Sequence, residues 1–148
     1  MVLLYKFEPM MKTLGSIMAF LVLFTACKYE DGPKLSLRTK KHRAVNTWHI
    51  DQVLENGMDK TTDYKNAYVN YQIDIKADNS YELKYRPFNF GEYVETGNWA
   101  FSGDKVFINF TPKDSKSPSQ WKILRLTETE TWVIQNINGK DVELRMKD

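Results

Sequence analysis

The side chains best suited to holding a ligand gather in one short stretch, from Tyr85 to Tyr93. Four aromatic residues and one arginine lie within it. Aromatic faces stack on sugar rings and on apolar molecules, and an arginine guanidinium orients an anionic group. The binding residues predicted from this stretch are Tyr85, Arg86, Phe88 and Phe90. The alternative is that Phe88 and Phe90 cap the mouth of a barrel as part of its core.

A second chemical feature is the only cysteine, Cys27, which follows an uncharged apolar run and the small pair Thr25-Ala26. The run from Ile17 to Phe24 has the ~7–15 residue length of a secretory h-region and is shorter than the roughly 20 residues of a membrane span. This layout resembles a bacterial lipobox, in which cleavage precedes the cysteine and a diacylglyceryl group is attached to its sulfur. We predict a helical signal peptide over residues 1–26 and lipidation of Cys27. An ordinary signal cleavage near Ala26 and a buried free cysteine are the alternatives.

Lipidation would also fix where the protein is found. Two acyl chains, palmitate among them, hold a protein stably on a bilayer where one chain is marginal. We therefore expect attachment to the bacterial outer membrane through the lipid anchor. Lys28, Glu30 and Asp31 resemble the surface-export signal of Bacteroidetes lipoproteins, with Tyr29 interrupting it. This slightly favours the cell surface over the periplasmic face.

Composition bounds the domain count and the classes of partner. Residues 1–26 carry two lysines and one glutamate, so their removal lowers the formal net charge from +2 to +1. A nearly neutral chain is not expected to bind nucleic acid. The roughly 120 residues that remain after the signal peptide are enough for a single domain. We place this domain at residues 45–148. Because Glu8 is unusual ahead of a secretory run, we also expect translation to start at Met10 or Met11 rather than Met1.

Residues 27–44 are predicted to be the acylated cysteine and a tether. The segment is polar and rich in turn formers, and it ends in a basic cluster that contains Lys40, Lys41 and Arg43. Three interpretations of it stay open. It is a solvated tether, or a basic cluster resting on anionic lipid, where each charge contributes ~1 kcal/mol, or a short helix that plugs one end of a barrel.

From Asn46 onward apolar residues alternate with polar ones, and this period of two indicates β-strands. Turn signals separate the strands, among them Asn56-Gly57 and Asn138-Gly139, whose residues tolerate positive φ. The longest predicted loop of the second half is Thr111 to Ser119. The sixth strand is apolar on both faces, so we expect a bulge or a fully buried stretch there. The first predicted strand starts at Asn46, and the others cover 69–75, 81–86, 92–101, 106–110, 120–126, 131–137 and 141–147.

Eight antiparallel strands joined mainly by hairpins remove their edges by closing on themselves. We predict an all-β fold, an eight-stranded antiparallel up-and-down barrel, with an open sandwich as the alternative. A barrel of this size is filled by side chains or holds one small ligand. The interior positions predicted to line such a ligand cavity are Trp48, Tyr71, Leu83, Trp99 and Ile108.

Several motifs share the pattern of one protein family. They are Trp48 near the start of the first strand, Gly97-Asn98-Trp99-Ala100-Phe101 at mid-chain, the tail Trp121 to Thr127 with an Asn-Gly hairpin after it, and the N-terminal Gly32-Pro33. Together with the lipobox, they resemble the small lipocalin-like lipoproteins of Bacteroidetes. The resemblance implies a lipocalin-like barrel. It supplies no functional residue beyond Cys27, because this fold hosts many unrelated functions.

The spacing of the histidines and acidic residues does not indicate a catalytic or metal-binding site. His42 lies in the predicted tether and His49 on the polar face of the first strand, whereas a zinc site needs three or four His, Cys or acidic ligands. Glu128 and Glu130 flank a predicted turn and are expected to be solvated rather than to form a catalytic acid pair. We therefore expect no catalytic residue, no metal and no cofactor.

Two functions remain open. The first is binding of a small hydrophobic or amphipathic molecule inside the barrel. The second is a non-catalytic interaction in the cell envelope, in which a filled barrel presents the 85–93 and 111–119 loops to glycan or to a protein partner. A cavity inside the barrel would favour the first function, and a filled core would favour the second.

Overall fold

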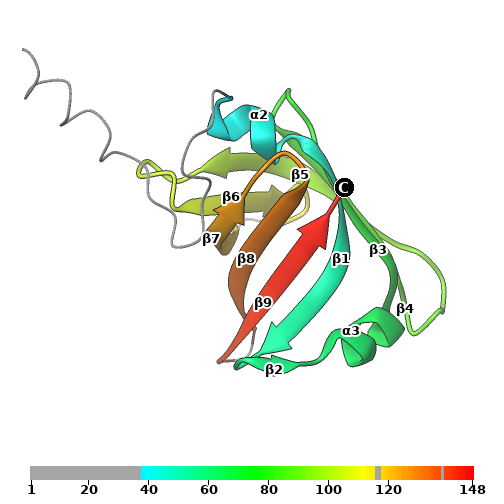
Figure 1. Cartoon of the computed structure of the whole chain (residues 1–148). Helices are drawn as coiled ribbons and strands as arrows, with labels where there is room; N and C mark the ends of the chain where they lie inside the picture. Colours follow the sequence, from blue (N-terminus) through cyan, green and yellow to red (C-terminus); the bar gives the residue numbers. More distant parts are fainter. Residues whose placement is uncertain (1–37, 116–117, 138) are drawn as a thin grey trace, which may run out of the picture.

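The computed structural model describes residues 38–115, 118–137 and 139–148 of the chain (Figure 1). The predicted signal peptide, Cys27, residues 28–37 and Asn138 of the predicted hairpin turn lie outside these described residues. None of the described helices is long and apolar enough to cross a membrane.

Antiparallel strands dominate the described part of the chain, and two short helices accompany them. The strands are β1 (Asn46–Glu55), β2 (Met58–Asp59), β3 (Tyr68–Ile75), β4 (Ser80–Pro87), β5 (Tyr93–Phe101), β6 (Phe107–Pro112), β7 (Ser119–Leu126), β8 (Glu130–Ile137) and β9 (Lys140–Lys147), and the helices are α2 (Lys40–Ala44) and α3 (Thr61–Ala67). Seven strands therefore lie close to their predicted positions, and β1 starts at the predicted residue.

The sheet closes into a barrel. Strands pair with their neighbours in chain order, and β1 also pairs with β9, from His49 opposite Lys147 to Glu55 opposite Val142. The closed ring contains β1 and β3 to β9, whereas β2 pairs only with the end of β1. The predicted eight-stranded up-and-down barrel is confirmed, and the open sandwich is excluded because no edge is left between β1 and β9.

The connection between β1 and β3 is more elaborate than the sequence predicts. Asn56 and Gly57 adopt φ of 50° and 80°, as expected for a tight hairpin turn, but the turn leads only to the two-residue strand β2. Helix α3 follows. Its start is fixed by side chains: Asp59 accepts a hydrogen bond from the Thr61 amide at 2.9 Å, and the Thr61 hydroxyl accepts one from the Val53 amide at 3.0 Å.

Helix α2 closes one end of the barrel, which we call the closed end (Figure 1). Ala44 is fully buried, and the indole Nε1 of Trp48 donates to its carbonyl oxygen at 3.0 Å. The Nε1 of Trp99 likewise donates to the carbonyl of Lys76 at 2.9 Å. Both buried indoles are thus satisfied by backbone groups. For residues 40–44 the structure supports the plugging helix among the three interpretations, so the folded domain begins before residue 45.

Polar contacts join the α2 region to three turns of the closed end. One contact reaches each of the β3–β4, β5–β6 and β7–β8 turns. They are Lys41 Nζ to Asn79 Oδ1 at 2.7 Å, Lys40 Nζ to the Lys105 carbonyl at 3.3 Å, and the ion pair of Arg38 with Glu128 at 3.1 Å. The helix is therefore seated across the whole end rather than against one hairpin.

The predicted loop from Thr111 to Ser119 is shorter than expected. Thr111 and Pro112 continue β6, and Ser119 starts β7. Pro112 is tolerated because it is the last residue of its strand, opposite Gly97. The predicted irregularity of the sixth barrel strand is confirmed, since the pairing of β7 with β8 shifts between Ile123 and Arg125.

Candidate ligand-binding cavity

A cavity of about 230 Å³ lies inside the barrel away from α2, and we call this the open end. Every strand of the closed ring and helix α3 contribute to its lining. The buried Ile73 and Leu144 line its inner part. Ser119 and Ile137 line its mouth, because they are the first residue of β7 and the last residue of β8. The barrel is thus not filled along its whole length.

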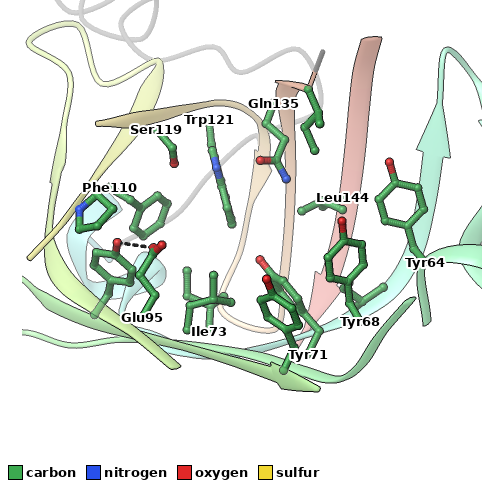
Figure 2. Close-up of a pocket in the computed structure, with 16 residues that line it drawn as sticks. Tyr64, Tyr68, Tyr71, Ile73, Glu95, Phe110, Ser119, Trp121, Gln135 and Leu144 are labelled. Carbon is green, nitrogen blue, oxygen red and sulfur yellow. Dashed lines mark hydrogen bonds between the residues drawn. The ribbon is translucent and has the colours of Figure 1, made fainter. Parts of the chain in front are cut away.

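One wall of the cavity is a continuous series of tyrosine rings. Tyr64 of α3 stacks on Tyr68 with ring centroids 5.7 Å apart, and Tyr68 meets Tyr85 edge to face at 5.2 Å. Tyr71 stacks on Tyr85 at 6.2 Å, with the two planes 19° apart. In Figure 2, Tyr64, Tyr68 and Tyr71 stand across the cavity from the side chains of β7 and β8. The wall offers ring faces and phenol hydroxyls to a ligand.

A backbone irregularity places two of these tyrosines on the same face. Strict alternation would put Tyr68 and Tyr71 on opposite faces of β3, because they are three residues apart. The pairing of β3 with β4 shifts between Val69 and Gln72, and Asn70 between them adopts φ of 57°. The extra residue of this bulge turns both tyrosines toward the cavity.

Glu95 supplies the only charged group among the residues that line the cavity. The Tyr81 hydroxyl donates to one of its carboxylate oxygens at 2.6 Å, the dashed line at Glu95 in Figure 2. The Tyr93 hydroxyl donates to the other oxygen at 3.0 Å. Within the described part of the chain, Glu95 has no ion-pair partner. An unneutralised carboxylate therefore faces an otherwise uncharged cavity.

Gly97 makes the approach of Tyr81 to β5 possible. A Cβ atom at this position would lie 2.8 Å from Cε1 of Tyr81 and 2.9 Å from Cα of Pro112, and closer still to the carbonyl oxygen of Thr111. Only a residue without a side chain fits there. The Tyr81 ring thereby lies close to β5 at Gly97, with its hydroxyl on Glu95.

The tyrosines around Glu95 stay protonated well above neutral pH. The pKa of Tyr93 is raised from 10.0 to about 12. Burial is the largest cause, followed by the hydrogen bond to Glu95 and the negative charge of Glu95. Burial and the same carboxylate raise the pKa of Tyr81 and of Tyr71 further. These phenols therefore act as neutral hydrogen-bond donors and ring faces, not as phenolates.

The opposite wall is mixed in chemistry. Ser119, Trp121 and Gln135 contribute a hydroxyl, an indole and an amide from β7 and β8 (Figure 2). The indole Nε1 of Trp121 is buried and has no hydrogen-bond partner among the described residues. A buried donor without a partner lowers stability by roughly 1–3 kcal/mol. A ligand acceptor at this point would relieve that loss.

The residues predicted to bind a ligand fall into three groups. Tyr71, Leu83 and Tyr85 line the cavity. Trp48, Trp99 and Ile108 are buried in the core outside the cavity lining, because they lie on the half of the barrel that α2 closes. Arg86, Phe88 and Phe90 are exposed on the end of β4 and the β4–β5 loop. With Phe88 70% and Phe90 79% exposed, the alternative that they cap the mouth as core is wrong.

Glu95, the charged residue of the cavity, is not among the binding residues predicted from the sequence. Glu95 shares its face of β5 with Gly97 and the buried Trp99, and a period of two counted back from Trp99 would have placed it inside. Tyr68 carried no such signal, because the bulge at Asn70 reverses its face. Tyr64 lies on a helix that the sequence pattern does not reveal.

A closed antiparallel barrel, plugged by a helix at one end and hollow at the other, is the architecture of a small ligand-binding β-barrel. The chain belongs to the lipocalin-like domain family, whose model matches residues 45–133. Among solved structures it is similar in fold to a lipocalin-like protein from Bacteroides uniformis, with a TM-score of 0.53 and 11% identity over 72% of this chain and 98% of that chain. No curated protein matches the sequence. The predicted lipocalin-like family is confirmed.

Proposed function

We propose that the protein holds one small, mainly aromatic molecule in the cavity at the open end. The observation that carries this proposal is an internal space of about 230 Å³ whose lining is mostly aromatic and aliphatic. A concave, largely apolar site with a few convergent polar groups is the usual form of a small-molecule site. The lipocalin-like family, whose members are generally binding proteins rather than enzymes, supports the same conclusion.

The volume limits the size of the ligand. An apolar cavity of about 150 Å³ is large enough for benzene, whereas pockets for drug-sized ligands measure roughly 300–1,000 Å³. A cavity of about 230 Å³ lies between these cases. It suits one ring, or two small fused rings, with a short substituent. A long acyl chain would not fit inside.

The test of this proposal fills the cavity. The barrel core is built from residues 44–146, so the chain from residue 27 onward, with Cys27→Ser to prevent acylation, contains all of it. Leu83→Trp places a large side chain in the space, whereas Arg86→Trp places the same side chain on the exposed face of the same strand. In an NMR titration, single-ring compounds should shift the resonances of cavity residues, including the Trp121 indole NH. We expect these shifts in the Cys27→Ser protein and in its Arg86→Trp variant. Binding that survives Leu83→Trp unchanged would contradict the proposal.

We further propose that binding takes place at the bacterial outer membrane, where an acylated Cys27 holds the chain. The support is the apolar run, the small pair before Cys27 and the absence of another cysteine in the sequence. Metabolic labelling with a palmitate analogue in a Bacteroidetes host should label the wild-type protein and leave Cys27→Ser unlabelled. A wild-type protein without label, or equal label on both, would exclude the anchor.

A second function is supported by a specific observation on the β4–β5 loop. Phe88 and Phe90 are exposed, and Phe88 adopts φ of 48°, a left-handed backbone conformation that is uncommon for a bulky residue. A turn that holds two exposed aromatic rings in this way suits contact with glycan or with an envelope protein. The double variant Phe88→Ala/Phe90→Ala should then lose retention on host glycan or envelope protein. Binding of small molecules in the cavity should not change.

A further inference from the structure

We propose that the ligand of this cavity carries a cationic amine, which pairs with Glu95 while the apolar part of the molecule packs on the tyrosine wall. This inference rests on the proposed function and specifies its ligand class. The candidate is a small molecule that joins an aromatic ring to a protonated amino group through a short chain.

The first support is the charge balance of the site. Glu95 is the only ionisable acid or base other than tyrosine that lines the cavity, and no lysine, arginine or histidine accompanies it. At the same end of the barrel, Glu55 is paired with Lys140 at 2.7 Å, so this pair adds no net charge. A partly buried carboxylate without a counter-ion favours a cation and disfavours an anion.

The second support is the free hydrogen-bonding capacity of that carboxylate. Its two oxygens accept from Tyr81 and Tyr93, each a neutral donor. An ionised carboxylate has about four acceptor sites, so two remain after these contacts. The same two hydrogen bonds hold the carboxylate in one orientation, which reduces the entropy lost when a ligand binds.

The third support is the aromatic surface around the carboxylate. Tyr85 lies 4.7 Å from Tyr93 and 6.2 Å from Tyr71 between ring centroids, so ring faces continue from the carboxylate to the mouth. A cation within about 6 Å of a ring face is attracted by it, by ~0.5–2 kcal/mol according to desolvation. The aromatic wall therefore adds to the preference for a cation that Glu95 creates.

The test uses three probes that share one phenyl ring and a short chain: 2-phenylethylamine, 2-phenylethanol and phenylacetate. They are titrated at pH 7 into the chain from residue 27 onward with Cys27→Ser, by calorimetry and by NMR. The amine should bind at least about tenfold more tightly than the alcohol, the size of one added charge-assisted hydrogen bond. Phenylacetate should bind most weakly.

Two variants separate a direct ion pair from a general effect of charge. Glu95→Gln removes the charge and keeps one acceptor oxygen for a tyrosine hydroxyl, while its NH2 group can donate to the other hydroxyl. The affinity for the amine should therefore fall to that for the alcohol. Glu92→Gln removes the same charge from an exposed position three residues away and should leave all three affinities unchanged. If Glu95→Gln does not fold, the three probes still show whether the Cys27→Ser protein with Glu95 intact prefers the amine to the alcohol and to phenylacetate.

Each outcome bears on a different claim. Equal binding of amine and alcohol, or an amine preference that persists in Glu95→Gln, would overturn the amine inference while small-molecule binding stands. If none of the probes binds at millimolar concentration and no cavity resonance shifts, the proposed function fails as well.

Discussion

At the residue scale, the hydrogen bond between Tyr81 and Glu95 depends on a neighbour without a side chain. Gly97→Ala would drive a methyl group into the backbone of β6 and the ring of Tyr81. We expect a loss of roughly 1–3 kcal/mol in the free energy of unfolding, the range for an overpacked site. Gly103→Ala is the matched control, because a Cβ there meets nothing within 4 Å, and it should change stability by less than about 0.5 kcal/mol. Urea unfolding measures both, and equal effects would contradict the packing argument.

The raised pKa values of the tyrosines around Glu95 predict a specific response to alkali. Tyr93 has a pKa of about 12 in the folded state against 10.0 for an unperturbed tyrosine, so the folded protein holds this proton more tightly than the unfolded chain. The stability from this group is fully present below about pH 10 and is lost as the pH rises toward 12. Unfolding measured across this range should show the decline, and it should be smaller in Glu95→Gln. Phenolate absorbance in which all tyrosines titrate together near pH 10, in both proteins, would refute this.

Individual cavity residues were predictable only where the strand was regular. Tyr71, Leu83 and Tyr85 follow from the alternation of β3 and β4 and do line the cavity. Trp48 and Trp99 also point inward, but alternation does not say which half of a barrel is closed.

At the element scale, helix α2 is held on the barrel by the buried contact of Ala44 with Trp48 rather than by its lysines. Its contacts through Lys40 and Lys41 are exposed, and exposed polar pairs contribute about 0–1 kcal/mol. The fully buried Trp48, whose indole is bonded to the Ala44 carbonyl, contributes far more. We expect Trp48→Ala to lower the free energy of unfolding by roughly 3–5 kcal/mol and Lys40→Ala/Lys41→Ala by less than about 1 kcal/mol. A double lysine variant as unstable as Trp48→Ala would show that the polar contacts of Lys40 and Lys41, rather than burial, hold the helix in place.

The two helices show the limit of periodicity as a signal. Helices α2 and α3 contain five and seven residues, too short for an apolar stripe to repeat. Helices of this length are marginal in isolation and form through tertiary contacts. For α2 the contact is the buried Ala44, and for α3 it is Tyr64 against the tyrosine wall. Neither contact is visible before the barrel is known, although a plugging helix was among the interpretations of residues 27–44.

At the scale of the whole molecule, the closed barrel was predictable and its hollow was not. Eight alternating segments separated by turn residues leave few ways to bury every apolar face, and closure of β1 on β9 is the one that forms. A cavity, in contrast, is the small difference between the space enclosed and the side chains that fill it, so it depends on how the rings pack. The sequence offered many aromatic residues, and these line the space at the open end instead of filling it.

The central claim is that the open end of this barrel holds one small molecule. Its most direct test is native mass spectrometry of the chain from residue 27 onward with Cys27→Ser, after incubation with an envelope extract of the host. We predict one discrete added mass of a small molecule, lost on denaturation, absent from Leu83→Trp and present in Arg86→Trp. An unmodified protein mass in every extract, or an added mass that Leu83→Trp retains, would contradict the claim and shift the function to the exposed loop of Phe88 and Phe90.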